Sequence, residues 1–184
     1  MSSWKKLSER TEPVGYRTLI FKKFRTPDGA EYEFTTYGKR GAQDVNVIPL
    51  TRDNKVVIAR QFRPGCERLM EEIPGGSVEV GEELQQAVAR ELMEETGYSA
   101  ERLEHIGYVV RDAYSNVVSH TFIGYDCKKT GEQNLDIGEY VETLEIPLEK
   151  LFLNAQTGQM TDAGGVLLAY DKLRALQGGV DDKI

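Results

Sequence analysis

The chain has 184 residues, with 23 Lys and Arg against 30 Asp and Glu, and a formal net charge of −7. This acidic balance argues against sequence-independent binding to nucleic acid, which requires a basic face that displaces counterions from phosphates. The length fits one domain with at most a small extra element, and a hydrophobic content of 40% is enough for a core. A small anionic ligand would be held by local cations or by a metal.

Cys66 and Cys127 provide no disulfide framework, and residues 1–13 are polar and lack the apolar core of a secretory signal. The apolar runs are short, and none approaches the roughly 20 residues that a membrane span needs. We therefore expect a cytoplasmic protein without a membrane segment. His105 and His120 lack the spacing of a zinc site or a catalytic triad, so structural or surface roles are expected.

The first part of the sequence predicts two antiparallel strand pairs. Apolar and polar residues alternate over residues 16–37 around Pro27-Asp28-Gly29, whose proline and glycine suit a tight reversal. Residues 44–50 and 55–62 form a second pair around Asp53-Asn54, with apolar runs that are typical of central strands. We expect a hairpin followed by the start of a buried sheet.

Glycines and prolines between residues 64 and 81 predict a loop with one short strand near Glu72-Ile73. A helix follows, beginning near Glu82 or Glu83 and ending at Gly97, where a glycine readily adopts the left-handed cap. Its inward stripe contains Leu84, Ala87, Val88, Glu91 and Glu95. An apolar stripe that runs into carboxylates is unusual for a helix that faces a core.

The rest of the chain predicts further strands and two helices. The strands are expected at residues 103–111, 119–126 and 140–146. Pro147 can begin a short helix that ends near Leu153, and Asp162 can cap a last helix that reaches about Leu176. This order indicates a mixed α/β chain with mostly antiparallel pairing, unlike the regular alternation of a doubly wound fold.

The acids of the helix allow two interpretations. About the helix axis, Glu91 and Glu95 lie roughly 40° apart and Glu94 lies about 60° to the other side of Glu91. A solvated acidic face is the usual role of a charge run, and it accounts for Glu94, which can pair with Arg90. It does not account for Glu91, whose neighbours one turn away are Ala87 and Glu95. Carboxylates beside a glycine-rich loop suit Mg²⁺ or Mn²⁺ that also holds phosphates, so we predict a divalent-metal site.

The spacing resembles the Nudix box: Gly, five residues, Glu, seven residues, then Arg-Glu-apolar-any-Glu-Glu-any-Gly-apolar. The fixed positions are filled by Gly76, Glu82, Arg90, Glu91, Leu92, Glu94, Glu95 and Gly97, and Tyr98 replaces the usual aliphatic residue. Further segments resemble the branch that hydrolyses ADP-ribose and nucleotide sugars, namely residues 4–7, 61–65, 71–76, 138–143 and 161–165. The resemblance implies hydrolysis of a nucleoside diphosphate linked to another group, by water attacking a phosphorus with divalent metals bound.

The resemblance also implies the fold and the assembly. The expected class is α+β, an α/β/α sandwich in which a mixed sheet lies between helices. A small N-terminal β sub-domain, residues 1–40, would help to build a homodimer whose chains both contribute to the substrate pockets. The hydrolase domain would cover residues 41–177, and residues 178–184 are expected to form a flexible tail.

Metal binding is implied for four groups of the box region, which are Glu91 and Glu95 as principal ligands, Glu94 as a second-metal or water-mediated ligand, and the carbonyl oxygen of Gly75. Arg90 would orient the glutamates. Two roles are compatible with the sequence for Glu82: an acid at the start of the helix or a direct metal ligand. Gly76 and Gly81 would permit turns of the loop.

The resemblance further implies a general base on a loop after the sheet. Glu139 is the best match and Glu142, which is also a candidate substrate contact, is second; the alternative is that both are ordinary solvated acids. Arg63 resembles an arginine that contacts phosphate or ribose, as suits a permanently charged fork. The alternative for Arg63 is a salt bridge to Glu71 or Glu72.

Trp4 resembles an aromatic residue that stacks on the nucleobase, although packing of the N-terminus is equally compatible with the sequence. The branch usually has a proline where this chain has Ala113, and Tyr114 resembles a marker of dinucleoside polyphosphate hydrolases. Three functions therefore remain open. They are hydrolysis of ADP-ribose or a nucleotide sugar, hydrolysis of dinucleoside polyphosphates, and nucleotide sensing without catalysis, which the complete set of box glutamates disfavours.

Overall fold

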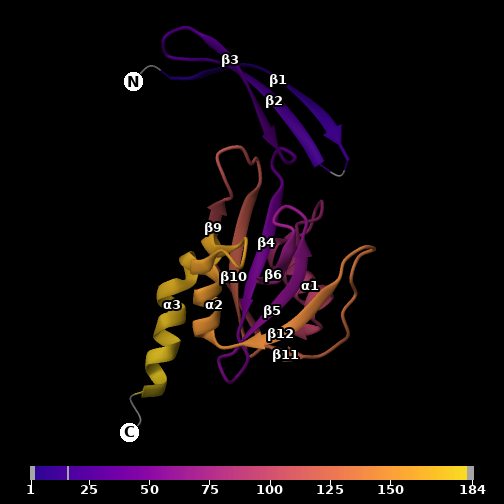
Figure 1. Ribbon diagram of the computed structural model, residues 1–184, viewed down its shortest axis with the longest axis vertical. Helices are drawn as coiled ribbons and strands as arrows, with labels where there is room; N and C mark the ends of the chain where they lie inside the picture. Colours follow the sequence, from indigo (N-terminus) through magenta and orange to yellow (C-terminus); the bar gives the residue numbers. More distant parts are fainter. Residues whose placement is uncertain (1–2, 16, 182–184) are drawn as a thin grey trace. The chain divides into compact units, whose positions relative to one another are not determined.

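The computed structural model describes residues 3–15 and 17–181 (Figure 1). Contacts along the chain separate two compact units. The first contains residues 1–43 and 110–118, and the second contains residues 44–109 and 119–184. The N-terminal unit thus takes a segment from the middle of the chain in addition to the predicted residues 1–40.

The N-terminal unit is an antiparallel sheet of three strands in the order β1-β2-β3. Its strands are β1 (Lys5–Val14), β2 (Arg17–Arg25) and β3 (Glu31–Tyr37). The pairing of β2 with β3 confirms the predicted hairpin, whose first residue, Tyr16, lies outside the described residues. Strand β1 was not predicted, because nearly all its side chains are exposed and it therefore lacks an apolar alternation.

Residues 110–118 are hydrogen-bonded to the end of β3. The Tyr37 amide donates to the Tyr114 carbonyl at 3.0 Å, and the Asn116 amide donates to the Tyr37 carbonyl at 2.9 Å. The Asn116 side chain also donates to Thr36 Oγ1 at 2.9 Å. The segment that departs from the family pattern at Ala113 therefore belongs to the N-terminal unit.

The second unit contains sheets of four, three and two strands, in the orders β7-β4-β10-β9, β12-β5-β6 and β11-β8. Their strands are β4 (Gln43–Pro49), β5 (Val56–Arg63), β6 (Arg68–Glu72), β7 (Gly75–Ser77), β8 (Tyr98–Ser99), β9 (Arg102–Val110), β10 (Val118–Tyr125), β11 (Lys128–Lys129) and β12 (Val141–Ile146). Strand β4 pairs with β7, and β5 pairs with β6 and β12, all in antiparallel orientation.

Three helices cover the sheets of this unit: α1 (Leu84–Thr96), α2 (Leu148–Thr157) and α3 (Ala163–Asp181). Side chains of β4 alternate between two cores. Val45 and Val47 belong to the core that contains α1, whereas Ile48 and Leu50 belong to the core that contains α2 and α3. Figure 1 shows α2 and α3 together on one side of the strands and α1 on the other. The predicted α+β class with a mixed sheet between helices is confirmed.

The predicted pairing of residues 44–50 with residues 55–62 was wrong, because β4 and β5 lie in different sheets. Leu50 and Val56 form an isolated antiparallel bridge beside the turn between them. An apolar run is typical of a central strand, but it does not select the neighbouring strand.

Most other predicted elements of the second unit are present, with differences in number and bounds. The short β8 was not predicted, and α2 ends at Thr157, beyond the expected end near Leu153. The segment predicted as a loop with one strand contains both β6 and β7, and a predicted turn contains the short β11. Helix α3 continues to Asp181, beyond the predicted end near Leu176 and into the predicted tail, whose residues 182–184 lie outside the described residues. No helix in the described residues is long and apolar enough to cross a membrane.

Candidate active site

Helix α1 begins and ends where the sequence predicts. It starts at Leu84 after an N-cap at Glu83, and its C-cap Gly97 has a φ of 75°, with its amide donating to the Met93 carbonyl at 2.8 Å. Ala87, Val88 and Leu92 of its inner face are buried against β4 and β10. This packing fixes the direction in which the following acids point.

Glu95 continues the buried face of α1 and is only 7% exposed. Its Oε2 accepts a hydrogen bond from the Gly75 amide at 2.9 Å. Burial raises the pKa of the Glu95 carboxyl to about 8; the charges of Glu91 and Glu139 also raise it, whereas the Gly75 bond and the charge of Arg63 lower it. A cation beside Glu95 would stabilise its ionised form.

Glu91 lies one turn earlier on α1 and is partly buried, which raises its pKa. A Cβ atom at Gly76 would overlap the Glu91 carboxylate. Gly76 is therefore required for the close approach of this carboxylate to β7, and not for the turn expected from the sequence. Gly81, with a φ of 85°, does have the backbone of a turn.

Arg90 donates hydrogen bonds to three acids of the box, Glu82, Glu91 and Glu94. Its Nη1 donates to Glu91 Oε1 and to Glu94 Oε2, both at 2.9 Å. Its Nε donates to Glu82 Oε1 at 2.9 Å, and its Nη2 donates to the Ser77 carbonyl at 3.1 Å. Neither of the residues one turn from Glu91 is basic, and its cationic partner in the structure is the adjacent Arg90. The predicted role of Arg90 in orienting the glutamates agrees with these contacts.

Glu82 precedes the helix and its N-cap. Besides Arg90, it contacts the Glu79 amide, which donates to its Oε2 at 3.0 Å. The hydrogen bond from Arg90 is the main cause of a lowered pKa at Glu82. Glu82 thus links the loop before α1 to Arg90. This role differs from both roles considered from the sequence.

No group of three or more His, Cys, Asp or Glu side chains in the described residues is arranged to hold a metal. The donor chemistry nevertheless fits a hard divalent cation. Glu91 and Glu95 offer carboxylate oxygens one helical turn apart, and the charge of Glu91 raises the pKa of Glu95. A cation between them would reduce the cost of two ionised carboxylates in a partly buried place. The residues present therefore fit Mg²⁺ or Mn²⁺.

Glu139 lies within electrostatic reach of these carboxylates, because its charge raises the pKa of both Glu91 and Glu95. Its Oε2 accepts a hydrogen bond from the Asp136 amide at 3.2 Å in the loop before β12. The structure thus brings Glu139, from a distant part of the sequence, into the electrostatic environment of α1.

Glu142 has a different environment. It lies on β12 and accepts a hydrogen bond from Arg60 Nε of β5 at 2.8 Å. Glu142 shares a strand face with Leu144 and Ile146, which belong to the core of α2 and α3. The structure therefore places it on the other face from α1.

Arg63 forms the salt bridge that the sequence offered as an alternative, with Glu72 at 2.5 Å. Its charge also lowers the pKa of Glu95, so it remains close enough to the acids to act on a ligand there. Trp4 belongs to the N-terminal unit, where its ring centroid lies 6.4 Å from that of Phe24 and 6.0 Å from that of Phe34. These contacts are those of a packing anchor, yet Trp4 remains 54% exposed.

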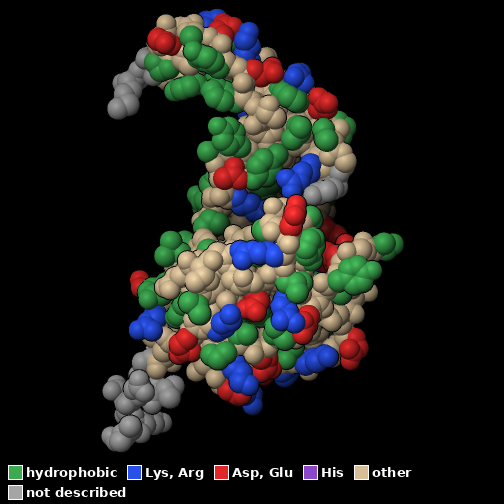
Figure 2. All heavy atoms as spheres, in the orientation of Figure 1, with side chains coloured by type: hydrophobic (Ala, Val, Ile, Leu, Met, Phe, Trp, Pro, Cys, Tyr) green, Lys and Arg blue, Asp and Glu red, His purple; other side chains and the backbone are tan. Residues whose placement is uncertain are grey.

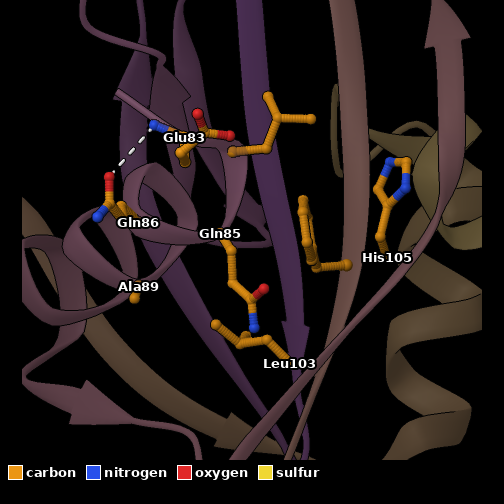
Figure 3. Close-up of a pocket in the computed structure, with 8 residues that line it drawn as sticks. Glu83, Gln85, Gln86, Ala89, Leu103 and His105 are labelled. Atoms are coloured by element: carbon orange, nitrogen blue, oxygen red, sulfur yellow. Dashed lines mark hydrogen bonds between the residues drawn. The ribbon is translucent and has the colours of Figure 1, made fainter. Parts of the chain in front are cut away.

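A groove between α1 and strands β9 and β10 does not include the box acids. Figure 3 shows Gln85 and Ala89 of α1 on one side of it and His105 on the other. His105 Nε2 lies 3.1 Å from His120 Nδ1, so the two histidines contact each other in the surface role that the sequence predicts. Figure 2 shows positive and negative side chains mixed over the visible face of the molecule.

The family model of the NUDIX domain matches residues 42–166. This chain belongs to the Nudix family. It is 34% identical over 121 residues to an ADP-ribose pyrophosphatase of Bacillus subtilis (strain 168), covering 65% of each chain. It is 31% identical over 125 residues to a methanol dehydrogenase activator of Bacillus methanolicus, covering 67% of this chain and 68% of the relative. The alignments thus span about two thirds of these relatives.

A solved structure described as an ADP compounds hydrolase has the same fold as this Nudix protein. The two superpose with a TM-score of 0.79 over 94% of this chain and 95% of the other, at 17% sequence identity.

The acids of the Nudix box were identified from the sequence, whereas Glu72 was considered only as an alternative salt-bridge partner of Arg63. The sequence signal for Glu72 is an acidic residue next to the apolar Ile73, at the short strand expected within a loop.

Proposed function

We propose that this Nudix protein hydrolyses the pyrophosphate bond of ADP-ribose or a related nucleoside diphosphate sugar, giving a nucleoside monophosphate and a sugar phosphate. The observation that carries the proposal is the buried Glu95 one helical turn from Glu91, a pair of carboxylates whose ionised form a bound cation would stabilise. Similarity to the Bacillus subtilis ADP-ribose pyrophosphatase supports the substrate class.

Glu91 and Glu95 would hold Mg²⁺ or Mn²⁺, with Glu94 and the Gly75 carbonyl as further ligands. When bound, such a metal neutralises phosphate charge and makes water a better nucleophile. Arg90 keeps the carboxylates oriented through its bonds to Glu91 and Glu94. Their geometry is thereby set before the substrate binds.

Glu139 is the proposed general base, with Glu142 as the less favoured candidate because of its place on the other strand face. Glu139 accepts a proton from the attacking water while the water oxygen forms a bond to phosphorus. The bond between that phosphorus and the bridging oxygen breaks, and the bridging oxygen leaves on the second phosphate. Arg63 contacts the phosphates or the ribose, where its fixed charge offsets theirs.

The N-terminal unit would supply the other parts of the proposal. Trp4, with its half-exposed ring, stacks on the nucleobase, and the unit as a whole contributes to a homodimer. The cytoplasmic location remains a prediction from the sequence. The alternative substrate class, dinucleoside polyphosphates, is favoured by one observation, the exposed ring of Tyr114.

The test is release of nucleoside monophosphate from ADP-ribose, ADP-glucose, GDP-mannose, UDP-glucose and diadenosine polyphosphates, with and without Mg²⁺. Metal-dependent turnover of ADP-ribose or a sugar nucleotide is the expected result. Preference for a diadenosine polyphosphate would support the alternative substrate class. Tight nucleotide binding without turnover of any compound would contradict both hydrolase proposals and support a sensor.

A further inference from the structure

Glu72, the last residue of β6, is a carboxylate with 0% exposure. A buried carboxylate is costly unless its oxygens are paired and hydrogen-bonded. Its environment must therefore contain donors that compensate for the lost water. Neither the box nor the metal ligands proposed above include this residue.

The two oxygens of Glu72 have different partners. Oε2 lies 2.5 Å from both Nε and Nη2 of Arg63. Oε1 accepts a hydrogen bond from the Thr161 amide at 3.2 Å and another from the Thr161 hydroxyl. Both oxygens are therefore satisfied, each by two donors.

These partners come from segments that are far apart in the sequence. Arg63 ends β5, whereas Thr161 lies between α2 and α3 and is separated from Glu72 by 89 residues. Glu72 thus links the end of a central strand to the turn that precedes α3. A change at Glu72 would loosen both segments.

Arg63 is the partner that can act on a ligand. Its side chain is 40% exposed, and its charge reaches Glu95. A guanidinium has five N–H donors in a rigid plane, and Glu72 engages the Nε edge. With that edge held, the plane of the group is set and the remaining donors have a defined direction.

We propose that Glu72 is a positioning residue, which orients Arg63 toward the phosphates of the bound nucleotide and anchors the turn at Thr161. This inference rests on the proposed function, in which Arg63 contacts the substrate. Misplacement of a binding group by about 1 Å can reduce the rate on the order of 100-fold. Loss of the Glu72 charge should therefore reduce substrate binding by Arg63 without touching the metal ligands.

The neighbouring Glu71 provides a matched control. It precedes Glu72 on β6, but its Oε2 accepts a hydrogen bond from Asn154 Nδ2 at 2.9 Å and lies 3.4 Å from Lys150 Nζ. Both partners lie on α2. Glu71 is thus a partly buried acid of the same strand whose contacts are directed to α2 and not to Arg63.

The experiment is a double-mutant cycle of Glu72→Gln and Arg63→Ala. For each variant, kcat, KM and the Mg²⁺ concentration for half activation are measured with the best substrate of the panel. Glu72→Gln should lower kcat/KM roughly 10- to 100-fold, mainly through KM, with an unchanged Mg²⁺ requirement. Adding it to Arg63→Ala should cause little further loss, because the two residues act together. Glu71→Gln should leave KM unchanged.

Two results would overturn the inference. One is that the losses of Glu72→Gln and Arg63→Ala multiply in the double variant, and the other is that Glu71→Gln raises KM as much as Glu72→Gln does. If Glu72→Gln does not fold, Arg63→Lys replaces it, since lysine keeps the charge beside Glu72 but not the fork. KM should then rise with little change in the melting temperature, and an unchanged KM would contradict the proposed orientation.

Failure of the proposed function gives a different pattern. If the wild-type protein hydrolyses no nucleotide, the same cycle is measured in the Kd for ADP-ribose, and coupling between Glu72 and Arg63 still supports the inference. Absence of coupling in Kd overturns it. If the wild type is active and Arg63→Ala is normal, the hydrolase proposal stands and the positioning role is excluded.

Discussion

Among the described residues of the second unit, the carboxylates of Glu72 at the end of β6 and of Glu95 near the end of α1 are both buried, but they have different partners. Glu72 has an arginine on one oxygen and two donors of Thr161 on the other. Glu95 has one backbone amide, from Gly75, and burial raises its pKa to about 8. The protein compensates the charge of Glu72 with its own groups, whereas we propose that a bound cation compensates the charge of Glu95.

The largest effect is expected from Glu95→Gln, which tests the dependence of Glu95 on a cation. The amide retains an oxygen for the Gly75 bond but removes an anionic ligand, so kcat should fall more than about 100-fold with the fold intact. Steady-state rates over a Mg²⁺ titration and circular dichroism are the measurements. Glu101→Gln, at an exposed acid of weak ion pairs, is the control; near-normal rates of Glu95→Gln at saturating Mg²⁺ would refute the metal assignment.

The stability of the metal-free protein should depend on pH through Glu95. Its folded pKa of about 8 exceeds the ordinary value of 4.5, so between these values the unfolded chain binds fewer protons. The contribution of Glu95 to the free energy of unfolding is therefore most favourable below about pH 4.5. It is lost as the pH rises from there to about 8, by up to about 1.4 kcal/mol per pH unit.

Urea unfolding in EDTA between about pH 5 and 9 measures this dependence. Glu95→Gln should flatten the profile, and Mg²⁺ should restore stability at the alkaline end. A wild-type profile as flat as that of the variant would show that Glu95 is not held in an environment that disfavours its charge.

Glu72→Gln should lower the free energy of unfolding, whereas Glu95→Gln should not. It weakens a satisfied charge pair with Arg63 and places an amide group among the donors of Thr161, so the free energy of unfolding should fall by about 1 to 3 kcal/mol. Metal-free Glu95→Gln at pH 8 should be at least as stable as the wild type. Equal destabilisation of both variants would contradict the distinction between the two carboxylates.

The smallest effect is expected from Gly76→Ala, which acts on the cation site through Glu91. The added Cβ displaces the Glu91 carboxylate, so the Mg²⁺ concentration for half activation should rise on the order of tenfold. Gly65→Ala, at a position with open space around it, is the control in the same Mg²⁺ titration. An unchanged Mg²⁺ requirement of Gly76→Ala would show that Glu91 is not confined as described.

The elements whose signals are local could be predicted from the sequence alone. The bounds of α1, the apolar stripe that runs into Glu91 and Glu95, and the hairpin of β2 and β3 follow from periodicity, capping and turn residues, all of which act over a few positions. The second predicted strand pair was wrong, because β4 and β5 lie in different sheets and the choice of a sheet partner is not a local signal. The spacing of the box was also sufficient to identify the family. Strand β1 escaped prediction because its side chains are mostly exposed and so leave no alternating pattern.

The contacts between distant segments became clear only from the tertiary structure. It placed Glu139 within reach of α1 and Glu142 on the other strand face, and it assigned residues 110–118 to the N-terminal unit. It also showed that Glu72 and Glu95 differ in their hydrogen-bond partners, because the donors of Glu72 include Thr161, 89 residues away. Burial and charge compensation depend on contacts between remote parts of the chain, and no local pattern of residues contains that information.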